Sequence, residues 1–110
     1  MPIEGPYKTN GRDDPSEAVV ITRLSENQYR VESSRQWDVV GIFDGNLYRG
    51  VFRYKDSMAY ESFRGRWGMH EAALRADGSF AVHGRFMAGD DDESDDDEFD
   101  LIWVPERRSW

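Results

Sequence analysis

Residues 39–52 read VVGIFDGNLYRGVF, in which two copies of one five-residue pattern flank a turn. The pattern is a large residue, any residue, Gly, any residue, and then Phe or Trp, and it recurs at residues 63–67 (FRGRW) and 82–86 (VHGRF). Because side chains alternate between the faces of a strand, the large residue, the glycine and the aromatic residue share one face. The glycine leaves a gap for a neighbouring ring and lets the strand coil sharply, which predicts a tightly curved antiparallel barrel with an aromatic interior.

Alternation of apolar and polar residues predicts further strands on both sides of this stretch. Residues 19–24 and 28–33 form a strand pair with a turn at residues 25–27, and residues 99–104 form the last strand, which Pro105 ends. The sequence thus predicts an all-β, single-domain, antiparallel up-and-down meander barrel of seven or eight strands.

Turn signals set the connections between these strands. Asp44-Gly45-Asn46 and Asp77-Gly78 are predicted hairpin turns, because glycine and asparagine adopt positive φ at low cost. The long segment of residues 59–76 is harder to assign, since residues 69–76 contain good helix formers that Gly78 could stop. A strand is favoured there, because strict alternation resumes directly after the Asp77-Gly78 turn.

A meander of about eight short strands with glycine-rich and aromatic-rich faces resembles the calycin group, which comprises lipocalins, fatty-acid-binding proteins and avidins. The resemblance covers residues 18–104 and concerns the architecture. It implies a small closed barrel.

At 110 residues the chain is long enough for one domain with a real core. The Pro-, Gly- and Asp-rich residues 1–16 are predicted to be a flexible N-terminal leader, and residues 17–110 the barrel domain, with an acidic hairpin loop at residues 89–98. The absence of cysteine excludes disulfides and thiolate metal sites. No apolar run reaches the length of a membrane span and no signal sequence begins the chain, so we expect a cytoplasmic protein without a membrane partner.

The net charge of −8 is unevenly distributed. Nine of the 22 acidic residues lie between residues 90 and 100, which leaves 13 acidic residues against 14 Lys and Arg, a net charge of +1, in the rest of the chain. The domain is therefore nearly neutral and carries one strongly acidic segment. A neutral body with only two lysines argues against non-specific nucleic-acid binding, which needs many phosphate contacts.

The aromatic face supplies the candidate ligand-binding residues. In the simpler interpretation these rings fill the barrel, since an eight-stranded barrel has room only for side chains or one small ligand. In the alternative they line a pocket for a small apolar or aromatic ligand, with Tyr hydroxyls and Trp N–H groups as polar contacts. The candidate residues are Trp37, Phe43, Tyr48, Phe52, Tyr54 and Trp67.

Arginines are predicted on the outer face by the same alternation. They either form an ordinary solvated exterior or bind an anionic partner such as a phosphate or an acidic protein segment. The candidate contacts are Arg49, Arg53, Arg64, Arg66 and Arg85.

The acidic loop allows three interpretations: a disordered, self-repelling loop that aids solubility, a segment that folds over the arginine face, or a contact for a basic protein partner. A calcium loop is a poor fit, because Asp95 and Leu101 would stand where an EF-hand needs Gly and Glu. The residues of the acidic loop are Asp90, Asp91, Asp92, Glu93, Asp95, Asp96, Asp97 and Glu98.

Catalysis and metal binding have little support. His70 and His83 are expected on adjacent strands, but Glu71 points to the opposite face from His70 and no third ligand is visible, so both are interpreted as surface histidines. We expect no cofactor and no catalytic site. The favoured hypothesis is a non-enzymatic module that holds a small apolar or aromatic ligand in the barrel. The alternative is a charge-driven protein-interaction or inhibitor module that uses the acidic loop or the arginine face.

Overall fold

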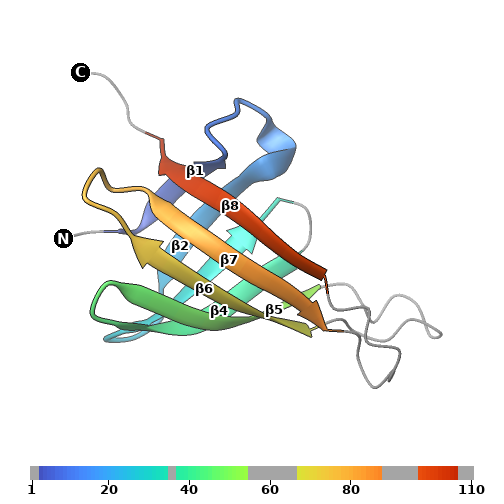
Figure 1. The fold of residues 1–110 in the computed structure, drawn as a ribbon. Coiled ribbons are helices and arrows are strands. Elements are labelled where there is room, and N and C mark those ends of the chain that lie inside the picture. The colour runs from blue at the N-terminus through green and yellow to red at the C-terminus, as the bar shows by residue number, and fades with distance from the viewer. Residues whose placement is uncertain (1–2, 35–36, 55–66, 88–96, 107–110) are drawn as a thin grey trace.

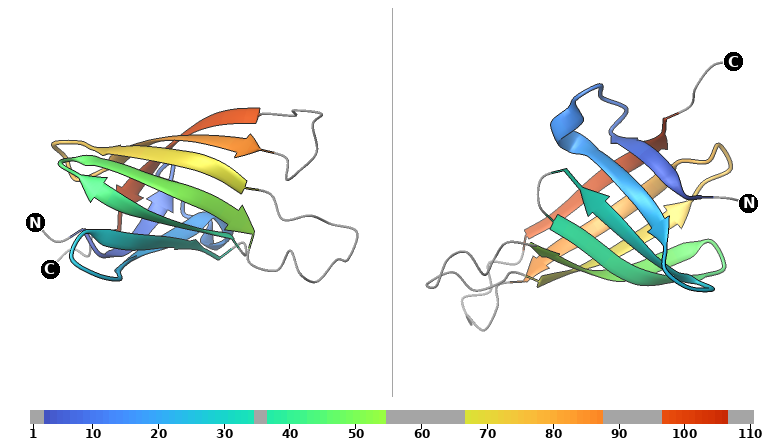
Figure 2. Two further views of the ribbon diagram at one scale, coloured as in Figure 1. Left: turned by 90° about the horizontal axis from the view of Figure 1, so that it is seen from below. Right: turned by 180° about the vertical axis from the view of Figure 1, so that it is seen from behind.

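The computed structural model describes residues 3–34, 37–54, 67–87 and 97–106. Eight antiparallel strands close into one barrel, in which each strand pairs with the next along the chain and the last pairs with the first (Figure 1). The views of Figure 2 follow this meander round the barrel. The strands are β1 (Gly5–Thr9), β2 (Ala18–Arg23), β3 (Gln28–Ser33), β4 (Trp37–Asp44), β5 (Leu47–Tyr54), β6 (Trp67–Leu74), β7 (Phe80–Met87) and β8 (Asp97–Pro105). The predicted all-β up-and-down barrel is confirmed.

Strand β1 corrects the flexible leader predicted over residues 1–16. It pairs with β2 along one edge and with β8 along the other, and its Tyr7 and Thr9 are buried. Further along this segment, Pro15–Glu17 forms a short 3-10 helix that begins at Asp14, whose side chain accepts a hydrogen bond from the Ser16 N–H. The composition of this segment predicted a flexible leader. The segment forms a strand instead, because the edges of β2 and β8 offer backbone N–H and C=O groups that need partners.

The hairpin turns lie where the sequence placed them. Asp44 pairs with Leu47 across a turn in which Gly45 has a φ of +69°, and Gly78, in the turn between β6 and β7, has a φ of +90°. In that second turn the Asp77 carboxylate accepts hydrogen bonds from the N–H and the hydroxyl of Ser79. Glycine is required at both positions because other residues rarely adopt positive φ.

Strands β6 and β8 test two further predictions, the strand over residues 69–76 and the bounds of the acidic loop. The favoured strand over residues 69–76 is confirmed up to Leu74, where β6 ends. The acidic loop is shorter than predicted, because Asp97 and Glu98 belong to β8, where Asp97 pairs with Phe86 and Glu98 with Arg85. The rest of that loop, residues 89–96, lies outside the described residues.

The core of the molecule is the interior of the barrel, and strands from all round the barrel contribute to it. Side chains alternate along each strand, so every second residue points inward and is removed from water. The middle of the barrel is filled in this way, as expected for eight strands. The buried apolar residues are Ile3, Tyr7, Val19, Ile21, Val31, Val39, Tyr48, Phe52, Ala72, Phe80, Val82 and Trp103.

Glycines of the repeated pattern bring neighbouring strands unusually close. Gly41 of β4 and Gly50 of β5 are paired, and a Cβ on Gly41 would lie 2.2 Å from the carbonyl oxygen of Arg49. A Cβ on Gly84 would lie 2.1 Å from the ring of Phe99, which fills the space above that glycine. The predicted room for a neighbouring ring is therefore present at Gly84, and the Gly41–Gly50 pair shows a close approach of two strands.

In the part of the chain that the structure describes, no helix is long and apolar enough to cross a membrane.

Candidate functional site

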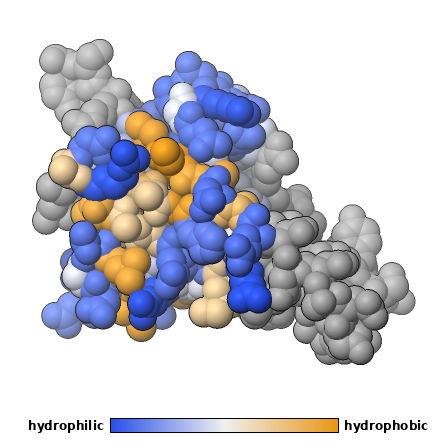
Figure 3. All heavy atoms as spheres, viewed as in Figure 1, coloured by the Kyte–Doolittle hydropathy of each residue, from blue (hydrophilic) through white to orange (hydrophobic). Residues whose placement is uncertain are grey.

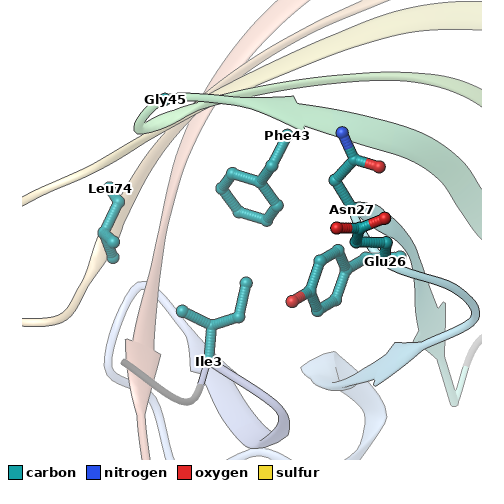
Figure 4. A pocket seen from close by; sticks show the side chains of 7 residues that line it. Ile3, Glu26, Asn27, Phe43, Gly45 and Leu74 are labelled. Atoms are coloured by element: carbon teal, nitrogen blue, oxygen red, sulfur yellow. The ribbon is translucent and has the colours of Figure 1, made fainter.

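A pocket lies at the end of the barrel where three hairpin turns meet. It has a volume of about 390 Å³ and is lined by Ile3, Glu26, Asn27, Tyr29, Phe43, Gly45 and Leu74. In Figure 4 the ring of Phe43 lies among the apolar side chains of Ile3 and Leu74, with the polar groups of Glu26 and Asn27 to one side. We call it the Phe43 pocket.

Aromatic rings connect the Phe43 pocket to the core. The Phe43 ring meets that of Tyr29 edge-on, with centroids 5.2 Å apart, and contacts the buried rings of Tyr48 at 5.1 Å and Phe80 at 5.8 Å. Edge-to-face and tilted pairs of this kind are favourable because ring edges are positive and ring faces negative. Phe43 is thus held in place from inside and exposed to the pocket on its other side.

Tyr48 is buried in the core and its hydroxyl is hydrogen-bonded within the protein. Its hydroxyl donates a hydrogen bond to the backbone carbonyl of Tyr29 at 2.8 Å, with the Val39 carbonyl at 3.4 Å. Burial, and then the negative charge of Asp38, raise the pKa of Tyr48 above its usual range, so the hydroxyl keeps its proton. The hydroxyl proton is therefore already used within the protein, and the role of Tyr48 as a contact for a ligand stays a prediction.

His70 lies inside the barrel, on the inner face of β6, with only 2% of its surface exposed. The interpretation of His70 as a surface histidine is wrong, because the pairing of β6 places it inward between Gly50 and Gly84. Four aromatic rings meet its imidazole, with centroids between 5.2 and 6.5 Å away. Together they form the His70 cluster: His70, Trp37, Phe52, Phe99 and Trp103.

Three buried polar atoms of the His70 cluster have no hydrogen-bond partner among the described residues. Neither ring nitrogen of His70 nor the Nε1 of Trp103 has a hydrogen-bond partner among the described residues. Burial, with a smaller contribution from His83, lowers the pKa of His70 to about 4, so its imidazole is neutral at pH 7. Most buried polar groups in native proteins are hydrogen-bonded, so these three atoms are an exception within the described part of the chain.

The outer face carries alternating charges. Arg49 pairs with Glu71 at 3.1 Å, and His83 pairs with Asp100 at 2.9 Å. The hydrogen bond to Asp100 raises the pKa of His83, with help from the charges of Asp100, Glu98 and Glu71. Figure 3 shows an outer face of the barrel, where polar side chains frame apolar ones. Arg49 therefore has an acidic neighbour on the surface, in an exposed ion pair.

The structure divides the predicted ligand-binding residues between the two ends of the barrel. Phe43 and Tyr48 lie at the pocket end, whereas Trp37 and Phe52 pack against each other, with centroids 5.3 Å apart, in the His70 cluster. The side chains of Tyr54 and Trp67 lie outside the described part of the chain, although Tyr54 pairs with Trp37 through the backbone.

Of the predicted arginine contacts, Arg49 and Arg85 are exposed on the outer face. The side chain of Arg53 lies outside the described residues, as do Arg64 and Arg66. Whether the arginines and the acidic loop bind a partner stays a prediction.

Sequence reasoning missed His70, Phe99, Trp103 and Tyr29 as members of the two sites. The inward direction of His70 was within reach, since it lies two residues from the inward-facing Gly68 and Ala72. Among the described residues, no group of three or more His, Asp or Glu side chains could hold a metal ion. His70 points inward and His83 outward, so the two histidines do not form a pair.

A second described cavity lies outside the barrel, against Lys8, Asp13 and Glu106. Lys8 forms an ion pair with Asp13 there, so the two charges satisfy each other. This cavity offers no unpaired group comparable to those of the His70 cluster.

Comparison of the chain with known protein families, with curated proteins and with solved structures finds no match.

Proposed function

We propose that the protein binds a small, mainly apolar or aromatic ligand at the end of its barrel, in the Phe43 pocket. The observation that carries this proposal is the pocket itself, about 390 Å³ in volume and walled by Ile3, Tyr29, Phe43 and Leu74. Ligand sites are typically concave, about 300–1,000 Å³ in volume, mostly apolar, and equipped with a few polar groups that orient the ligand.

Polar groups that could orient a ligand are present at the rim of the Phe43 pocket. Glu26 and Asn27 belong to the turn between β2 and β3, and both side chains line the pocket (Figure 4). The ligand would therefore place an apolar or aromatic body against Phe43 and a hydrogen-bonding group toward the turn. Eight-stranded barrels such as lipocalins and streptavidin hold one small ligand, and membership of the calycin group is part of this proposal.

Nuclear magnetic resonance titration with a panel of small aromatic and aliphatic compounds tests the proposal. Binding should shift the signals of Tyr29, Phe43 and Leu74, and Phe43→Ala should weaken it about tenfold, because the ring's buried contact area is lost. Ile42→Ala is the matched control, since Ile42 neighbours Phe43 but points outward and is 53% exposed. A panel that leaves the pocket signals unchanged, or equal weakening by both substitutions, would overturn the proposal.

A further inference from the structure

The His70 cluster is built by the backbone pairing of four neighbouring strands. Gly50 of β5, His70 of β6, Gly84 of β7 and Phe99 of β8 lie side by side in one row across the barrel wall. Because Gly84 has no side chain, the ring of Phe99 reaches over it and meets His70, with centroids 5.8 Å apart. The pattern of glycines thus creates a ring-sized space directly beside a buried imidazole, and Phe99 occupies it.

Hydrogen-bonding capacity in the cluster defines what could replace that ring. A neutral imidazole has one N–H donor and one bare nitrogen acceptor, and the indole of Trp103 adds a second N–H donor. The His70 and Trp103 rings are in edge-to-face contact, with centroids 5.2 Å apart, so a polar group that hydrogen-bonds to one ring has the other ring as a neighbour. A hydroxyl group fits this set, since it can donate to the imidazole nitrogen and accept from the indole N–H.

Charge and burial restrict the ligand further. The side chains of the cluster are uncharged, because burial lowers the pKa of His70 to about 4 and the other members are aromatic. A charged ligand would lose its hydration without gaining an opposite charge, which is strongly unfavourable. The ligand should therefore be neutral.

Phe99 and Trp37 are the two half-buried members of the His70 cluster. Trp103 is 1% exposed and fixed in the middle of the barrel, whereas Phe99 is half-buried and lies in the third position of β8. Rotation of the Phe99 side chain can therefore open the space above Gly84 without disturbing the strand pairing.

We propose that the His70 cluster is a second binding position, at which a small neutral aromatic molecule with one hydroxyl group displaces the Phe99 ring and hydrogen-bonds to His70 and Trp103. No residue of the His70 cluster lines the Phe43 pocket, and the inference does not rest on the function proposed above. In the structure the Phe99 ring occupies the position proposed for the ring of the ligand.

Phenol and toluene are suitable probes, because they match in shape and differ in the hydroxyl group. Binding to the full chain carrying Phe99→Ala would be measured by calorimetry, and the side-chain nitrogen signals of His70 would be followed by nuclear magnetic resonance. We expect phenol to bind about tenfold more tightly than toluene and to shift the His70 signals, because only phenol can pair with the bare imidazole nitrogen of His70 and the indole N–H of Trp103. The outer His83 is the internal control, and its signals should not move.

Replacing the histidine in the same background completes the test. Phe99→Ala with His70→Leu should still bind toluene but lose the preference for phenol. Equal affinities of the two probes in Phe99→Ala, or a His70 signal that stays unchanged on phenol binding, would overturn the inference. If Phe99→Ala does not fold, Phe99→Leu and the unsubstituted protein at high phenol concentration give the same comparison. Binding in the Phe43 pocket alone would shift Phe43 and leave His70 unchanged, so the two proposals fail separately.

Discussion

Two rows of residues cross the same four strands of the barrel, one residue apart, and their chemistry is opposite. The inner row is Gly50, His70, Gly84 and Phe99, and the outer row is Arg49, Glu71, His83 and Asp100. The inner row is buried or half-buried and has no charged member at pH 7, whereas the outer row alternates between basic and acidic side chains.

The two histidines show most directly what this difference means. Burial lowers the pKa of His70 to about 4, while a hydrogen bond to Asp100 raises the pKa of His83. His70 and His83 lie on neighbouring strands and are offset by one position in the pairing, since His70 pairs with Gly84 and His83 with Glu71. A shift of one residue thus decides between a neutral and a readily protonated imidazole.

Adding a methyl group at Gly41, on the inner face of β4, should have the largest effect on the free energy of unfolding. Gly41→Ala would place a Cβ 2.2 Å from the backbone oxygen of Arg49, and a backbone atom cannot rotate away. The two strands would have to separate, so we expect a loss of about 3 kcal/mol or more in the free energy of unfolding. Urea denaturation measures it.

The outer neighbour of Gly41 provides the control for that prediction. Ile42 is 53% exposed, so Ile42→Ala should change the free energy of unfolding by no more than about 0.5 kcal/mol. A similar small effect of both substitutions would show that the strands are not held as closely as the Gly41–Gly50 pair indicates.

The second-largest effect should be the pH dependence of the free energy of unfolding between pH 6.5 and 4, to which His70 contributes and His83 does not. The pKa of His70 is about 4 in the folded protein and about 6.5 in the unfolded chain, so the unfolded chain binds the proton first as the pH falls. Stability is therefore complete above about pH 6.5 and is lost progressively between pH 6.5 and 4, by up to about 3 kcal/mol.

Replacement of each histidine tests this assignment. His70→Leu should flatten the change in unfolding free energy between pH 6.5 and 4.5, whereas His83→Gln should leave it in place. Denaturant unfolding at a series of pH values gives both curves. An unchanged slope in His70→Leu would contradict the buried, neutral state of this histidine.

Substitutions at the neighbouring β5 residues Tyr48 and Arg49 compare how much a buried hydrogen bond and an exposed ion pair contribute to the free energy of unfolding. Tyr48→Phe removes the hydrogen bond to the Tyr29 carbonyl and should cost about 1–2 kcal/mol, because the acceptor stays buried. Arg49→Ala removes a pair whose side chains are 63% and 45% exposed, and should cost less than about 1 kcal/mol. Salt should reduce only the second effect, and a salt-sensitive Tyr48→Phe would argue against this assignment.

The smallest effect concerns the outer His83. Asp100→Asn removes the hydrogen-bonded charge, so the pKa of His83 should fall toward its ordinary value of 6.5, as nuclear magnetic resonance titration would show. Because the pKa of His83 is raised in the folded state, its interaction with Asp100 stabilises the protein fully below about pH 6.5. This stabilisation is lost as the pH rises through the folded-state pKa. A pKa of His83 unchanged by the substitution would exclude Asp100 as its cause.

Local patterns predicted the fold well, because alternation and turn chemistry act over a few residues. The glycine turns at Gly45 and Gly78 and the strand at residues 69–74 needed no knowledge of distant partners. The first strand was missed for the opposite reason: Gly5–Thr9 is extended because it pairs with Val104 and Trp103 from the far end of the chain, through Lys8 and Thr9.

The candidate sites were predicted only in part. Phe43 was found because an aromatic residue closes the glycine pattern, and it does line a pocket. Trp37 and Phe52 were assigned to the same wall as Phe43 and Tyr48, but the structure places the two pairs at different ends. Alternation tells which face a residue occupies and not its height in the barrel, which depends on the stagger between strands.

The sequence by itself determined the all-β meander, the aromatic interior and the charged exterior, because the period of two residues and the turn-forming glycines are local properties. Only the tertiary structure decided the closure through β1, the Phe43 pocket, and the meeting of His70 with Trp103 and Phe99. These depend on the pairing register of strands that are far apart in the chain, and a register shift of one residue would exchange the inner row for the outer one.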